Sequence, residues 1–98
     1  MKTGLKPLRL HLISFYFDEI KAGRKLVEYR LADRWEKRLA GRSFSEILVC
    51  RGYPRNGDRE RILRMEWRGY AIETITHEHF GPLPVRVLAI DVAVPVMD

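Results

Sequence analysis

Short segments in which apolar and polar residues alternate recur along this chain, and they constrain its fold more than any other feature. Leucines alternate with a basic residue or a histidine in Leu8–Leu12, and apolar residues alternate with charged ones in Val27–Leu31 and in residues 63–67. A period of two is typical of a β-strand that buries one face. We therefore expect strands at these three places.

Three further segments complete the pattern. Residues 47–50 are a short apolar run, which predicts a strand buried on both faces, and residues 51–58 contain Tyr-Pro and Asn-Gly, which predict a loop. Residues 70–76 resume the strand pattern after Gly69, so we expect one long strand bent or bulged at this glycine. Residues 85–94 are almost entirely apolar and predict a final buried strand.

Two helices are predicted in the first half of the chain. Ser14 is placed to cap a helix over residues 15–22, and Gly23 follows where a left-handed residue commonly ends a helix. Asp33 begins an Asp version of the capping box, which predicts a second helix over residues 34–40.

Five to six short strands with two short helices leave few crossover connections, which favours an α+β fold built as a small mixed β-barrel. The 98 residues have the size of one domain, and a chain of this length buries roughly two thirds of its unfolded surface. We expect one domain over residues 1–98, with one core and one site.

The chain shows no sign of export. Arg9 and His11 interrupt the opening residues 1–13, which therefore lack the apolar centre of a signal peptide, and no segment approaches the roughly 20 apolar residues of a membrane span. The lone cysteine, Cys50, excludes an internal disulfide and is expected to be a buried thiol. We expect a cytoplasmic protein without a membrane partner.

The charge favours a polyanionic partner. The chain has 18 Lys and Arg against 13 Asp and Glu, a net charge of +5, and 13 of the cations are arginines, which bind phosphate in a fork and stack on bases. Residues 24–68 contain 13 of the cations and 7 of the acids. Mildly basic proteins without a nucleic-acid partner are also common, so charge alone leaves both alternatives open.

Glu28 and Arg30 share one face of the strand Val27–Leu31 by parity, whereas Lys25 has the opposite parity and joins them only if the turn after Gly23 is irregular. The three side chains either form a functional site, or Glu28 and Arg30 form an ordinary ion pair on a solvated strand face. In a site, the lysine could serve base chemistry or bind a phosphate.

The segment Gly23-Arg24-Lys25-Leu26-Val27-Glu28-Tyr29-Arg30 fits the motif G-x-K-x-x-E-x-R of the ASCH family. Further similar segments are Tyr16-Phe17-Asp18-Glu19-Ile20, Arg51-Gly52-Tyr53-Pro54, and Thr74-Ile75-Thr76-His77 with Phe80-Gly81. The chain resembles the small stand-alone ASCH proteins common in phages and prophages, over nearly its whole length. The resemblance implies a PUA-like β-barrel with a cleft beside the first helix that binds RNA or nucleotides.

The resemblance also implies possible hydrolase activity, because some small ASCH proteins are amidohydrolases of N4-acetylcytidine and others have been assigned ribonuclease activity. Those amidohydrolases have a threonine where this chain has Glu28, and their further catalytic glutamate lies in a helical insert that is shortened here to residues 76–80. Only Lys25 and Arg30 match that pattern, which speaks against this particular activity.

Other candidate residues have simpler interpretations. His77 and His79 lie on one side of an extended segment, but two histidines make an incomplete metal site, so we expect no metal and no cofactor, and a polar loop with His77 lining the cleft. An apolar flank disfavours Cys50 as a nucleophile. Trp67 alternates with core residues and is assigned to the core, which leaves Tyr53 as the better candidate for stacking on a base.

Three functions remain. In the first, Lys25 and Arg30 meet the polar or phosphate groups of RNA, a single-stranded nucleic acid or a nucleotide, and Glu28 accepts hydrogen bonds from a base edge. The residues expected to follow the backbone are Arg51, Arg55, Arg64 and Arg68. The second is a hydrolase of a modified nucleoside or of RNA, with Lys25 and Glu28 as catalytic groups. The third is a phage-encoded protein that binds a host protein through its basic face.

Overall fold

The computed structural model describes residues 4–97, so Met1, Lys2, Thr3 and Asp98, which belong to the predicted domain and its opening segment, lie outside the described residues. The described chain is an α+β structure of two α-helices, six strands and one short 3-10 helix. Its elements, in order, are β1 (Leu8–Leu12), α1 (Ser14–Lys21), β2 (Val27–Leu31), α2 (Ala32–Leu39), β3 (Ile47–Arg51), β4 (Ile62–Met65), β5 (Tyr70–Ile75), η1 (Glu78–Phe80) and β6 (Val85–Asp91).

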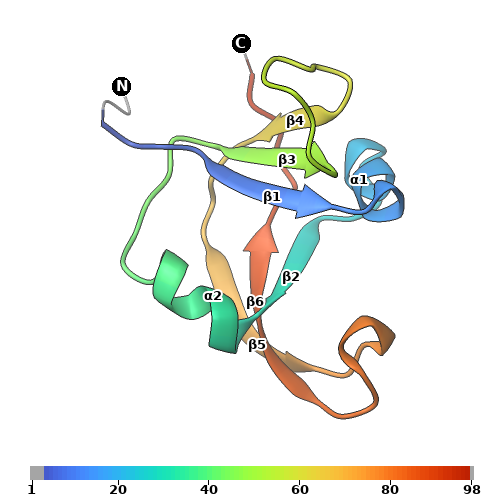
Figure 1. The fold of residues 1–98 in the computed structure, drawn as a ribbon. Coiled ribbons are helices and arrows are strands. Elements are labelled where there is room, and N and C mark those ends of the chain that lie inside the picture. Colours follow the sequence, from blue (N-terminus) through green and yellow to red (C-terminus); the bar gives the residue numbers. More distant parts are fainter. Residues whose placement is uncertain (1–3, 98) are drawn as a thin grey trace.

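The strands form two three-stranded sheets, drawn one above the other in Figure 1. In the upper sheet β3 lies between β1 and β4, and it pairs parallel with β1 and antiparallel with β4. In the lower sheet β6 lies between β2 and β5, and both pairings are antiparallel. The α+β class and the expected number of five to six strands are thus confirmed, while the pairings of these strands do not close a barrel.

The prediction of one long strand bent at Gly69 is wrong. β4 and β5 belong to different sheets, and residues 66–69 carry the chain from one sheet to the other. The backbone groups of this segment bond to the end of the chain: Glu66 N donates to Val94 O at 2.7 Å, and Asp91 N donates to Gly69 O at 3.2 Å. Gly69 has a φ of +85°, which a residue with a side chain rarely adopts, so the chain changes direction there.

Both helices begin earlier than predicted, and neither begins with a side-chain cap. The Ser14 hydroxyl accepts a hydrogen bond from Arg51 Nε at 3.0 Å, so it does not cap α1. α2 follows β2 without a loop, which places Asp33 in its first turn, where a carboxylate is favoured by the helix dipole. Gly23 follows α1 with a φ of +78°, as predicted.

The final strand is shorter than predicted. β6 ends at Asp91, whose carboxylate accepts a hydrogen bond from Ala93 N at 2.9 Å. The residues that follow leave the lower sheet and run along β4, with a bridge between Met65 and Pro95. The apolar pattern beyond Asp91 therefore reflects partial burial, with Val92 in the core, and not the length of the strand.

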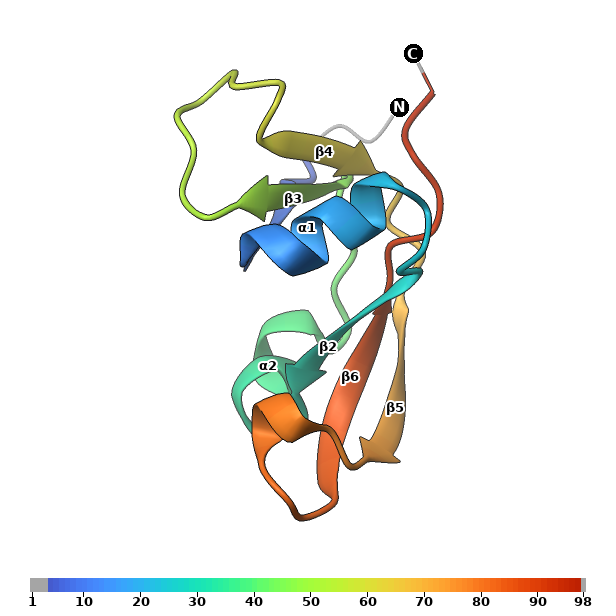
Figure 2. The same ribbon diagram turned by 90° about the vertical axis from the view of Figure 1, so that its right-hand side faces the viewer.

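A single apolar core joins the two sheets and both helices. Its fully buried side chains include Leu10 of β1, Phe17 of α1, Leu39 of α2, Val49 of β3 and Ile90 of β6. Figure 2 shows α1 beside the sheet of β1, and α2 and η1 beside the sheet of β2. The two helices thus flank the region where the sheets meet.

None of the helices formed by residues 4–97 has the length and apolar character needed to cross a membrane.

Candidate functional site

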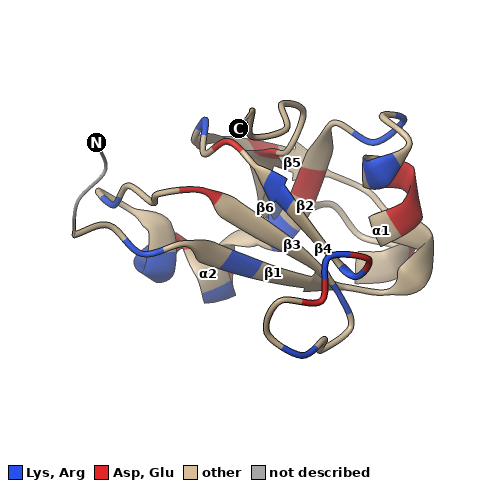
Figure 3. Ribbon diagram, turned by 90° about the horizontal axis from the view of Figure 1, so that it is seen from above, with Lys and Arg blue, Asp and Glu red and all other residues tan. Residues whose placement is uncertain are grey.

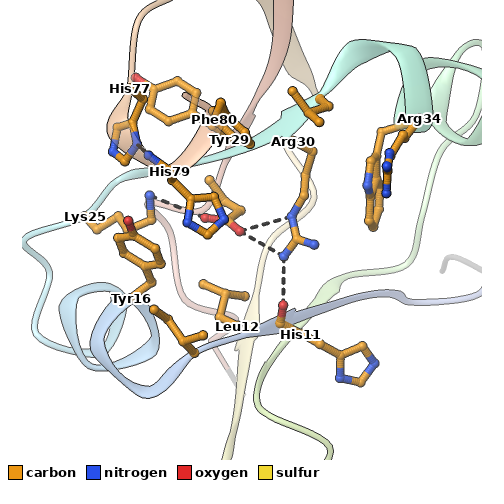
Figure 4. Close-up of a pocket in the computed structure, with 14 residues that line it drawn as sticks. His11, Leu12, Tyr16, Lys25, Tyr29, Arg30, Arg34, His77, His79 and Phe80 are labelled. Carbon is orange, nitrogen blue, oxygen red and sulfur yellow. Dashed lines mark hydrogen bonds and ion pairs between the residues drawn. The ribbon is translucent and has the colours of Figure 1, made fainter. Parts of the chain in front are cut away.

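A pocket of about 300 Å³ lies where the end of β1 and the start of α1 face β2, α2 and η1 (Figure 4). Both sheets contribute to its lining, so the pocket exists only in the folded chain. Of the residues considered as site candidates from the sequence, Lys25, Glu28, Arg30, His77 and His79 line it.

The most unusual feature of the pocket is a buried carboxylate. Glu28 is 7% exposed and is the one buried charged residue between residues 4 and 97. Its Oε1 lies 3.4 Å from Lys25 Nζ, and its Oε2 lies 2.8 Å from Arg30 Nη2 and 3.0 Å from Arg30 Nε. Two cations therefore compensate one acid, and the cluster has a net positive charge.

The local backbone explains how Lys25 reaches this cluster in spite of its parity. After Gly23 the chain makes an irregular turn in which the amides of Arg24 and Lys25 both donate to Glu19 O, at 2.9 and 3.1 Å. The regular alternation of β2 then directs Glu28 and Arg30 to the same face. The structure therefore brings the three motif residues together as predicted for a site.

The alternative of an ion pair on a solvated strand face is wrong. Glu28 and Arg30 do form an ion pair, but Glu28 is buried, and the side chains of Lys25 and Arg30 are each 18% exposed. The polar face of β2 is directed into the pocket, which residues of α1 and η1 also line. A buried ion cluster of this kind is a costly way to stabilise a fold, since desolvation offsets most of the attraction between the charges.

Arg30 also links the two sheets. Its Nη2 donates to His11 O of β1 at 3.0 Å, which is drawn in Figure 4. The His11 ring is held in turn through its Nδ1, which lies 2.8 Å from Gly52 O. The guanidinium thus has a fixed position at one end of the pocket.

Aromatic rings form the walls. Lys25 Nζ lies 5.1 Å from the centre of the Tyr16 ring and 5.5 Å from that of Tyr29, and the Arg30 guanidinium lies 4.9 Å from that of Trp35. These distances allow cation–π attraction. Phe80 of η1 completes the wall. The sequence alone predicted no role for Tyr16 and Tyr29, although both lie in the segments that resemble the ASCH family.

His77, the residue before η1, and His79 of η1 both line the pocket. His77 Nδ1 accepts a hydrogen bond from His79 N at 3.1 Å, and the ring of His79 meets that of Tyr16 edge to face with centres 6.1 Å apart. Within residues 4–97, no group of three or more His, Cys, Asp and Glu side chains is arranged to hold a metal ion.

The remaining predicted ligand residues lie outside this pocket. Three of the four arginines expected to follow a nucleic-acid backbone are paired with carboxylates instead: Arg51 Nη2 with Asp18 at 3.8 Å, Arg64 Nε with Glu46 at 2.7 Å, and Arg68 Nε with Asp91 at 3.3 Å. Arg55 is exposed in the loop after β3.

The two aromatic residues weighed against each other differ in burial. Trp67 is half-buried and packs edge to face on Phe44, with ring centres 4.9 Å apart, which agrees with its assignment to the core. Tyr53 is 87% exposed and stacks on His11 with ring centres 4.2 Å apart. One face of the Tyr53 ring is therefore covered by an imidazole while most of the side chain meets solvent.

Cys50 is fully buried in β3 and has no disulfide partner. Burial raises the pKa of its thiol, and the Arg9 guanidinium offsets this only in part. The thiol donates a weak hydrogen bond to Leu48 O at 3.5 Å. A buried thiol of this kind is a poor nucleophile.

Comparison with known proteins gave no match: no protein-family model, no curated protein and no solved structure is similar to this chain.

Proposed function

We propose that the pocket binds the base of an RNA nucleotide or of a free nucleotide, and that Lys25, Glu28 and Arg30 recognise its polar edge. The observation that supports this proposal is the buried Glu28 carboxylate, held between two cations at a pocket with aromatic walls. Well-packed apolar side chains would stabilise the fold at least as well as a buried ion cluster, so a ligand is a better explanation than stability.

The chemistry of the lining suits a nucleobase. A base has flat faces that stack on aromatic rings and an edge of hydrogen-bond donors and acceptors. The carboxylate of Glu28 accepts hydrogen bonds from amino or ring N–H groups, and Lys25 and Arg30 donate to carbonyl oxygens or to a phosphate. A volume of about 300 Å³ matches the lower end of small-ligand sites, which span roughly 300–1,000 Å³.

The ASCH resemblance rests on the same residues, and we extend the proposal to it: the chain is an ASCH-type domain with a PUA-like arrangement of its two sheets, and it acts in the cytoplasm. Support comes from the convergence of the three motif residues, Lys25, Glu28 and Arg30, in one pocket. The buried, unpaired thiol of Cys50 is compatible with a reducing compartment.

The test uses one conservative variant and one matched control. Lys25→Met keeps the aliphatic stem against Tyr16 and Tyr29, and Arg30 still pairs with Glu28, so the melting temperature should be unchanged or slightly raised. Affinity for nucleotides should fall about tenfold or more, because a charged hydrogen bond contributes roughly 1.5–3 kcal/mol. The control is Lys21→Met, which removes an exposed lysine of α1 outside the pocket and should leave affinity unchanged.

Calorimetric titration of the purified protein with the four ribonucleoside 5′-monophosphates and with short RNAs provides the measurement. Equal loss of affinity in Lys25→Met and Lys21→Met would show that only net charge matters and that the pocket is not the site. Marked destabilisation of Lys25→Met without any ligand found would make the cluster purely structural.

A hydrolase is the second candidate function, because Lys25 Nζ lies 3.4 Å from Glu28 Oε1, close enough for the two groups to share in moving a proton. Glu28→Gln is nearly isosteric and separates the two functions. A binding domain should lose modest affinity, whereas a hydrolase should keep its binding and lose roughly 10²-fold or more in rate. Mass spectrometry of modified nucleosides and RNAs incubated with each protein measures the rate.

A further inference from the structure

A second, larger hollow adjoins the pocket. It measures about 720 Å³ and lies between the start of the chain with β1 on one side and α2 with the residues that follow it on the other. Six of its lining residues are cations: Lys6, Arg9, Arg30, Lys37, Arg38 and Arg42. We call this hollow the basic groove. Figure 3 shows Lys and Arg on both β1 and α2, the two elements that border it.

No carboxylate borders the basic groove among residues 4–97. The acids of neighbouring elements face elsewhere: Glu36 of α2 pairs with Arg86 of β6 at 3.3 Å, and Glu46 pairs with Arg64 of β4 at 2.7 Å. Apart from Arg30, which pairs with Glu28, no cation of the groove forms an ion pair with a carboxylate of the described chain. The groove therefore has an uncompensated positive charge.

The groove and the pocket lie next to each other. His11, Arg30 and Trp35 line both of them. The Trp35 ring is contacted by the Arg30 guanidinium, 4.9 Å from its centre, and by that of Arg38, 4.0 Å from its centre. A ligand with one group in the pocket can therefore extend past Trp35 into the groove without leaving the surface.

The pocket and the basic groove together fit a strand of nucleotides better than a single nucleotide. A base enters the pocket only if it is unpaired, and its neighbours are joined to it by phosphodiesters that carry one negative charge each. Positively charged grooves beside stacking aromatic rings are typical of single-strand binding surfaces. Tyr53, which is 87% exposed, also borders the groove and provides a ring on which a neighbouring base can stack.

From this arrangement we infer that the basic groove binds the phosphate backbone of a single-stranded RNA, one base of which occupies the pocket. The inference rests on the proposed function of the pocket, and it identifies the ligand as a nucleotide within a strand. It assigns the backbone contacts to cations of β1 and α2, whereas Arg51, Arg64 and Arg68 are already paired with carboxylates.

The experiment compares two variants with the same change in charge. The groove variant is Lys6→Gln/Lys37→Gln/Arg42→Gln, which leaves Arg38 on the Trp35 ring in place, and the control is Lys21→Gln/Arg59→Gln/Arg61→Gln, in which all three replaced cations are exposed and outside both hollows. The probe is a fluorescently labelled RNA hexamer of random sequence, titrated by anisotropy between about 50 and about 200 mM salt.

The groove variant should bind the hexamer at least tenfold more weakly than the wild type and the control. The slope of log affinity against log salt should fall by about 2, because each phosphate contact in a single strand contributes about 0.7. Its affinity for the ribonucleoside monophosphates should be unchanged, which also shows that the pocket is still folded.

The inference is overturned if the hexamer does not bind the wild type, if the control loses as much affinity as the groove variant, or if the loss appears instead in Arg51→Gln/Arg64→Gln/Arg68→Gln. Failure of the proposed function looks different. In that case Lys25→Met binds the hexamer and the monophosphates as the wild type does, while the groove variant still has a reduced affinity for the hexamer.

Discussion

The cations of the β3–β4 side and those of the basic groove differ in a way that their sequence does not show. Arg51, Arg64 and Arg68 lie in a segment rich in arginine, yet each is within ion-pair distance of a carboxylate from another element. The groove cations Lys37 and Arg38 directly follow Glu36 in the sequence but face a surface without acids. An excess of arginine in a segment therefore does not locate a binding surface.

The reason is that electrostatic potential depends on distances in space. An acid near an arginine in the fold largely cancels its field at distances well beyond their separation, whichever segment contributes the acid. Folding distributes Asp18, Glu46 and Asp91 around one set of arginines and none around the other. The contrast leads to predictions that compare matched residues from the two sets.

The largest effect on stability is expected for the buried pair. Arg30→Met removes one of the two cations that compensate Glu28, together with the hydrogen bond to His11 O, and should reduce the free energy of unfolding by about 3 kcal/mol. Arg68→Met breaks an ion pair whose side chains are 50% and 36% exposed, and should cost less than about 1 kcal/mol. Urea denaturation of both variants measures the difference.

If both variants lose the same small amount of unfolding free energy, Glu28 is solvated in solution. In Arg30→Met/Glu28→Leu the uncompensated acid is absent as well, so much of the stability should return while binding stays lost. That double variant distinguishes a destabilising buried charge from a general loss of packing.

The next prediction compares the two tryptophans in their effects on stability and on hexamer affinity. Trp67→Ala removes a half-buried ring packed on Phe44 and should cost on the order of 3 kcal/mol of stability, with hexamer affinity unchanged at a temperature where the variant is folded. Trp35→Ala removes the ring between the pocket and the basic groove and should weaken hexamer binding as well. A change in affinity for Trp67→Ala that matches the one for Trp35→Ala would mean that both act through stability.

The smallest effect on the fold is expected at Tyr53. Because the side chain is 87% exposed, Tyr53→Ala should leave the melting temperature nearly unchanged, while hexamer affinity falls by about 1 kcal/mol or more, as expected for one lost stacking contact. Tyr53→Phe keeps the ring and serves as the control. Anisotropy with the same RNA hexamer gives the affinities, and an unchanged value for Tyr53→Ala would exclude a base on this ring.

Local pattern predicted much of the secondary structure. Strands β1 and β2 have the predicted bounds, because alternation over five residues is a strong signal for a half-buried strand. The bounds of the helices and of β6 were less accurate. Ser14 and Asp33 are residue types that commonly cap helices. The Ser14 hydroxyl, however, accepts a hydrogen bond from Arg51 of a distant strand, and α2 begins directly after β2.

In the candidate site, too, some residues could be predicted from local pattern and others could not. The motif spacing pointed to Lys25, Glu28 and Arg30, and strand parity placed Glu28 and Arg30 on one face, since all three lie within eight residues of one turn and one strand. Tyr16, Trp35 and His79 complete the pocket from α1, α2 and η1. No local signal links these segments, because their proximity results from the packing of two sheets around one core.

The amino-acid sequence by itself determined the strands, the approximate helices, the turn at Gly23 and the excess of arginine, since each of these depends on neighbours within a few residues. Only the tertiary structure decided that residues on the two sides of Gly69 enter different sheets, that Glu28 is buried, and which cations are paired. Burial and ion pairing depend on contacts between distant segments, and the same local pattern is compatible with several such arrangements.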